Sequence, residues 1–155
     1  FLPHLNKMIL AISASSAFLA LSVTWLSLKA ATVEYSSPNR LIAELRLAQL
    51  SSLLLVFVSG IYVGGTLLSS QVITGGFEIA FATGFFMTAC LATTREPSTA
   101  LKILAASWIA HSILDIAHIK NFMNATTLPP WYPFACALYD IYIALVCLVP
   151  VVYKK

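Results

Sequence analysis

Apolar residues dominate five long segments of the chain, and short polar stretches separate these segments from one another. The segments cover about residues 8–28, 47–68, 75–94, 101–119 and 131–153. Each is close to the ~20 residues that an α-helix needs to cross a hydrocarbon layer ~30 Å thick. Since lipid offers the backbone no hydrogen-bond partner, all five are predicted to be α-helical. The pattern therefore predicts an all-α integral membrane bundle of five transmembrane helices in a single domain, residues 1–155.

The polar stretch before the second segment contains a helix start. Ser37 can act as the N-cap, and Pro38 fits the first helical position. Arg40 and Glu44 follow four residues apart, a spacing that lets them pair on one face of a helix. We therefore expect an amphipathic lead-in over residues 38–46 that enters the membrane near position 47.

Composition narrows the class of protein further. Hydrophobic residues make up 59% of the chain and charged residues only 10%, against the ~25% charged residues of a typical soluble domain. The mean hydropathy is +0.87, and the net charge of +3 is spread along the chain without a basic run. These values exclude a soluble domain and give no support for a nucleic-acid partner. The expected partners are the lipid bilayer and either other membrane subunits or further copies of this chain.

The Lys and Arg residues in the short loops predict the orientation, because cytoplasmic loops are enriched in positive charge. The side that holds the N-terminus collects two of them, Lys7 and Lys120. The other side collects seven, which are Lys29, Arg40, Arg46, Arg95, Lys102, Lys154 and Lys155. We therefore expect a multi-pass protein with its N-terminus outside and its C-terminus in the cytoplasm. A cleaved signal peptide is disfavoured, because no Ala-x-Ala site follows the long first apolar run.

The stretch SWIAHSILDIAHIK places His111, Asp115 and His118 within about 60° of one another on a helix. That face is expected to point into the bundle, because an Asp exposed to lipid costs ~2.5–3.5 kcal/mol on insertion scales. Glu78 and Asp140 bring carboxylates from two other spans. His111 and Asp140 are expected at the same depth, about 13–14 Å from the outer surface, with the other groups nearer that surface. Three further residues could support this group: Ser107, Tyr62 and Cys136.

The segments YVGG, FEIAF, HSILDIAH and WYPFACALYD together resemble an uncharacterised family of small bacterial polytopic membrane proteins. The resemblance covers about residues 60–145, and the first span looks like an addition to it. It implies a bacterial inner-membrane location and no particular chemistry. It also implies that six residues form one set: Glu78, His111, Asp115, His118, Cys136 and Asp140.

Two kinds of function fit these residues. One is a binding site in the outer half of the bilayer, either for a divalent metal such as zinc or iron or for protons or a polar head group such as a quinone. The other is an accessory structural subunit of a respiratory, photosynthetic or other redox complex, in which the same residues hold helices together. A bis-His haem is disfavoured, because His4 is the only histidine outside the fourth span.

The sequence leaves open whether the protein is an enzyme. It contains no nucleophile elbow, phosphate-binding glycine loop or dinucleotide fingerprint. No loop is longer than about 20 residues, which leaves no room for a soluble catalytic domain. Any reaction would have to take place inside the bundle.

Overall fold

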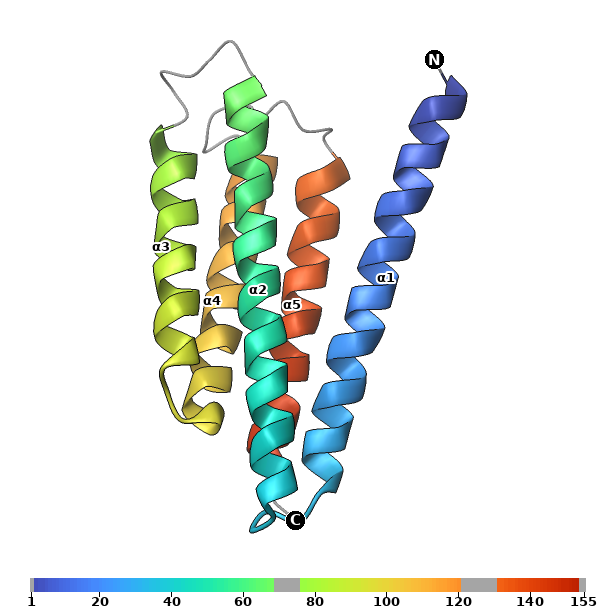
Figure 1. The fold of residues 1–155 in the computed structure, drawn as a ribbon. Coiled ribbons are helices and arrows are strands. Elements are labelled where there is room, and N and C mark those ends of the chain that lie inside the picture. The colour runs from blue at the N-terminus through green and yellow to red at the C-terminus, as the bar shows by residue number, and fades with distance from the viewer. Residues whose placement is uncertain (1, 69–75, 121–130, 154–155) are drawn as a thin grey trace.

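The computed structural model describes residues 2–68, 76–120 and 131–153 (Figure 1). Within these ranges the chain forms five long α-helices and no strand. The helices are α1 (Leu2–Thr32), α2 (Pro38–Leu68), α3 (Gly76–Thr93), α4 (Pro97–Ile119) and α5 (Trp131–Val152). All five are long and apolar enough to span a membrane, which confirms the predicted all-α fold class.

Two helix starts show how the local sequence sets the boundaries. The Ser37 hydroxyl accepts a hydrogen bond from the backbone N–H of Asn39 at 3.3 Å. Helix α2 then runs without a break from Pro38 through the expected lead-in. Helix α4 begins at Pro97, four residues before the expected position 101. The fixed φ of proline suits the first turn, where its missing N–H removes no helical bond.

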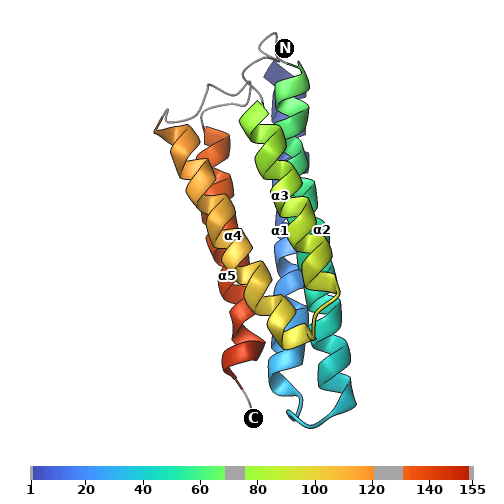
Figure 2. The same ribbon diagram turned by 90° about the vertical axis from the view of Figure 1, so that its left-hand side faces the viewer.

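Consecutive helices run in opposite directions, and each contacts the next in the chain (Figure 1). Helix α5 returns to contact α1, and α2 also reaches α4 and α5, so the five helices close into one bundle. The pairs α4–α5 and α2–α3 have the most extensive contacts (Figure 2). Helices α1 and α3 are the most peripheral, because only 22% of each span is buried, against 50% of the span in α4.

Helix α4 supplies the centre of the apolar core. The Trp108 side chain is fully buried, and its Nε1 donates to the Ser51 hydroxyl of α2 at 2.8 Å. The Cys147 thiol of α5 lies 3.3 Å from the same hydroxyl. Three helices therefore meet at one satisfied polar contact inside an otherwise apolar layer.

A proline inside α5 leaves a carbonyl free for a hydrogen bond from α1. Pro150 has no N–H, so the Val146 carbonyl one turn earlier lacks its usual helical donor. The Ser27 hydroxyl of α1 donates to that carbonyl at 2.7 Å. One turn away along α1, the Thr24 hydroxyl is hydrogen-bonded to the Tyr142 hydroxyl.

Candidate metal centre

Three buried side chains meet between α4 and α5. His111 and Asp115 lie one turn apart on α4, and Asp140 faces them from α5. The His111 Nδ1 lies 2.7 Å from Asp140 Oδ2 and 3.7 Å from Asp115 Oδ2. His111 is 3% exposed, and both aspartates are fully buried. The structure therefore brings together His111 and Asp140, which the sequence placed at equal depth in the membrane.

Tyr62 of α2 joins this group through a hydrogen bond. Its hydroxyl donates to Asp115 Oδ1 at 2.5 Å. Its ring stacks on the His118 ring, with the two centroids 4.8 Å apart. The sequence alone could not separate such a contact from an interfacial anchor, and the structure places Tyr62 in contact with the buried group.

The aspartates have more hydrogen-bonding capacity than the protein fills. Among the residues that the structure describes, Asp115 Oδ2 and Asp140 Oδ1 are buried without a hydrogen-bond partner. With both carboxyl groups ionised, two negative charges face a single imidazole. The group therefore carries net negative charge even when His111 is protonated. A cation at this point would relieve the cost of burying that charge.

Glu78 of α3 and His118 of α4 form a second, separate pair. Glu78 Oε1 lies 3.7 Å from His118 Nε2, and both side chains are nearly buried. His118 Nδ1 lies 2.8 Å from the Leu114 carbonyl of its own helix. The pair borders a cavity of about 20 Å³ that Tyr62 also lines. The predicted set of residues is thus divided between the contact of α4 with α5, at His111 and Asp140, and the contact of α3 with α4, at Glu78 and His118.

Two of the predicted supporting residues lie outside these contacts. The Ser107 hydroxyl donates to the Ile103 carbonyl of its own helix at 2.8 Å, which satisfies it locally. Cys136 is a half-buried free thiol and is not part of the group of converging metal ligands in the described ranges. Ser107 therefore shares the helical face without contacting the aspartates.

Sequence reasoning missed two residues that shape the site. The Phe85 ring of α3 lies against His111, with ring centroids 4.9 Å apart. The Ser112 hydroxyl donates to the Ala137 carbonyl at 3.2 Å and links α4 to α5 beside the site. The spacing offered a signal for Phe85, because it lies seven residues after Glu78 and thus on the same face of α3.

The residues present fit a metal ion that prefers nitrogen and oxygen ligands. One donor atom from each of His111, Asp115 and Asp140 lies within 4.8 Å of the other two. Tetrahedral ligands at ~2.1 Å from zinc are about 3.4 Å apart. The 2.7 Å contact between His111 and Asp140 must therefore widen, or Asp140 must turn its unpartnered Oδ1 inward. Three protein ligands would leave a fourth position open for water or another small ligand.

No protein family, curated protein or solved structure matches this chain.

Proposed function

We propose that this membrane protein binds a divalent metal ion, zinc or iron, inside the bundle at His111, Asp115 and Asp140. The observation that carries the proposal is the convergence of three buried donor groups within 4.8 Å. An imidazole with two carboxylates is a donor set that suits zinc and non-haem iron.

The charge of the site supports a bound cation. Ionised groups at membrane depth are expensive unless they are paired, and here two carboxylate oxygens have no hydrogen-bond partner within the described part of the chain. Tyr62 donates to Asp115 and thereby fixes the orientation of one expected ligand. Groups that orient metal ligands in this way typically raise metal affinity by about 10–100-fold.

Ligand-dependent stability tests this proposal. Zinc or iron(II) at 100 times its dissociation constant should stabilise the purified protein by about 2.7 kcal/mol, and a chelator should reverse the effect. His111→Leu and Asp140→Asn should abolish the stabilisation, whereas Ser107→Ala should retain it. An equal response in all four proteins, or none in the wild type, would contradict the proposal.

A second candidate is an accessory subunit in which these residues serve helix packing. The observation that favours it is that the polar contacts join four helices. His111–Asp140 links α4 to α5, and Tyr62–Asp115 links α2 to α4. The Glu78–His118 pair adds α3. Native mass measurement after gentle solubilisation separates the two candidates. A self-contained metal protein is isolated alone or as a homo-oligomer, whereas an accessory subunit retains larger partners.

We also propose the location that the loop charges and the family resemblance favour, a bacterial inner membrane with the N-terminus outside. Cysteines introduced into residues 33–37 and into residues 121–128 should react from opposite sides of the membrane. The second segment lies outside the described residues, although α4 ends and α5 begins at the end of the bundle opposite residues 33–37 (Figure 1). Labelling of both segments from the same side would contradict this topology.

A further inference from the structure

An apolar groove of about 570 Å³ runs between α3 and α4. This volume falls in the range of sites that hold small organic ligands. Small residues keep the groove open, with Gly84 on one wall and Ala106 and Ala110 on the other. The two helices diverge from the turn that joins them, which is plain in Figure 2.

The groove faces the surroundings of the bundle in the middle of the two spans. Gly84, Ala106 and Ala110 are all exposed. The two hydroxyls along the groove are satisfied by their own helices, since Thr88 donates to the Gly84 carbonyl and Ser107 to the Ile103 carbonyl. In a membrane, apolar molecules from the hydrocarbon layer would fill this opening.

The inner end of the groove adjoins the cavity beside the second polar pair. Phe81, Phe85 and Leu114 line both spaces. Glu78 and His118 border the cavity from the other side, with side chains only 5% and 6% exposed. In the described part of the chain, Glu78 Oε2 and His118 Nε2 have no hydrogen-bond partner.

The Glu78–His118 pair lacks a hydrogen-bond donor among the described residues. The Leu114 carbonyl can only accept, so the His118 Nδ1 beside it carries the proton and donates. In the neutral imidazole, Nε2 is then an acceptor. The Glu78 carboxylate is an acceptor too, and the two acceptors lie 3.7 Å apart. A hydroxyl group entering the cavity would supply the missing donor.

We propose that the groove between α3 and α4 binds a lipid-soluble molecule with a hydroxyl head group, such as a long-chain phenol, quinol or alcohol. The apolar tail lies along Gly84, Ala106 and Ala110. The hydroxyl passes between Phe81 and Leu114 and donates to the Glu78–His118 pair. His111 and Asp115 also line this cavity, but the hydroxyl bonds to neither of them, so binding of the molecule should not require the metal.

Photolabelling in lipid nanodiscs tests the proposal with a matched pair of probes. The first is a long-chain alkylphenol that carries a diazirine on its tail, and the second is its methyl ether, which cannot donate a hydrogen bond. We expect the phenol to label α3 and α4, in competition with unlabelled phenol, about tenfold more strongly than the ether. That ratio is the effect expected for one hydrogen bond to a charged group.

Two variants locate the tail and the head group. Gly84→Leu should fill the groove and abolish the competed labelling, because a Cβ at Gly84 meets no other atom within 4 Å and the helix can accept it. Gly60→Leu is the matched control, since Gly60 is equally open on α2 and lies outside the groove. Glu78→Gln places an amide donor beside His118, so the preference for phenol over ether should disappear while α3 and α4 remain labelled.

Three outcomes would overturn the proposal. The first is equal labelling by phenol and ether, which would mean that ordinary lipid fills the groove. The second is labelling spread over all five helices, and the third is an equal response of Gly84→Leu and Gly60→Leu. Labelling with and without a metal chelator distinguishes this result from the metal proposal, because the competed phenol labelling should survive removal of metal.

Discussion

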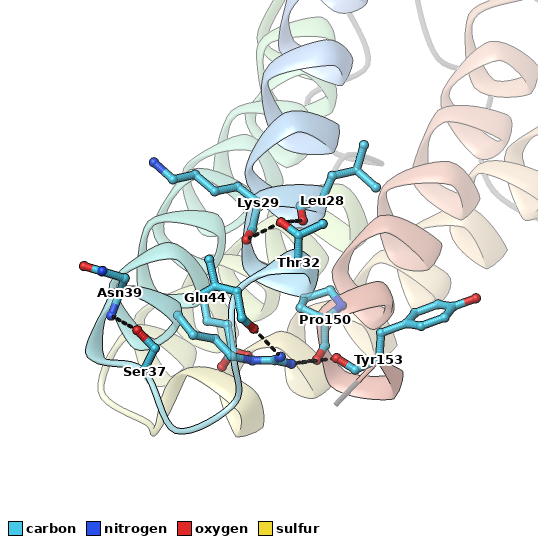
Figure 3. Close-up of polar contacts among 10 residues, drawn as sticks. Leu28, Lys29, Thr32, Ser37, Asn39, Glu44, Pro150 and Tyr153 are labelled. Atoms are coloured by element: carbon cyan, nitrogen blue, oxygen red, sulfur yellow. Dashed lines mark hydrogen bonds and ion pairs between the residues drawn. The ribbon is translucent and has the colours of Figure 1, made fainter. Parts of the chain in front are cut away.

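Two regions of the bundle bury charge in opposite ways. Near the end of α5, the Arg40 guanidinium is 2% exposed, lies over the Tyr35 ring and donates hydrogen bonds to four acceptors. It donates to Glu44 at 2.9 Å, to the Val33 carbonyl at 3.1 Å, and to the Pro150 and Tyr153 carbonyls at 2.6 and 2.8 Å (Figure 3). Deeper in the bundle, the His111, Asp115 and Asp140 group leaves two carboxylate oxygens unpartnered among the described residues.

The difference distinguishes a structural contact from the proposed metal site. Arg40 satisfies carbonyls at the end of α5, where the last turn of any helix has free acceptors and the helix dipole is negative. Its charge is balanced by Glu44, so nothing further is needed there. Within the described part of the chain, the two aspartates keep unpartnered acceptor oxygens, so they have a capacity for a cation that the Arg40 contact lacks.

Loss of Arg40 should have the largest effect on stability. Arg40→Leu leaves Glu44 buried without its partner and removes the donors of three carbonyls, so we expect a destabilisation of about 3–5 kcal/mol. Thermal unfolding in detergent measures this effect. Arg46→Leu is the matched control, because Arg46 is exposed on the same helix and its loss should change stability by less than about 0.5 kcal/mol. Similar losses in both variants would show that the buried contacts of Arg40 do not determine stability.

His111→Leu should destabilise the protein less and remove its metal. The variant leaves the buried Asp140 Oδ2 without its hydrogen-bond partner, so we expect a cost of about 1–3 kcal/mol in metal-free protein. Unfolding with and without chelator measures the two effects separately. If zinc still stabilised His111→Leu, the metal site would not need this imidazole, and the proposed set of ligands would be wrong.

Tyr62→Phe should have a smaller effect that appears mainly in metal affinity. The variant keeps the ring and removes the donor to Asp115 Oδ1. We expect a loss of about 0.6–1.7 kcal/mol in stability, typical of a polar contact between membrane helices. Zinc titration should show affinity weakened by about 10–100-fold. Unchanged affinity would mean that Tyr62 does not orient the carboxylate.

Ser107→Ala should have almost no effect. The hydroxyl bonds to its own helix, so stability should change by less than about 0.5 kcal/mol and metal content should stay the same. Unfolding and metal analysis on the same sample check both expectations. A loss of metal in this variant would restore Ser107 to the site that the sequence suggested.

The sequence predicts the helices well because membrane spans follow from length and apolar composition. It also places His111 level with Asp140, since the rise per residue fixes depth within antiparallel helices. It also allows Glu78 to pair with His118, but it does not decide between one shared site and two separate pairs, because that depends on how far α3 stands from α5. The spacing predicts the Arg40–Glu44 pair, which the structure contains, but the other three contacts of Arg40 were hidden, since those acceptors are backbone carbonyls that carry no residue-specific signal.

Elemental analysis of the purified protein tests the central claim most directly. The wild type, expressed with zinc and iron supplied and purified without chelator, should carry a single equivalent of one of these metals per chain. His111→Leu and Asp140→Asn should lose that metal while remaining folded, and Arg46→Leu should keep it. A folded wild type that contains neither metal and takes up none on titration would contradict the account. So would variants at His111 and Asp140 that retain the full equivalent.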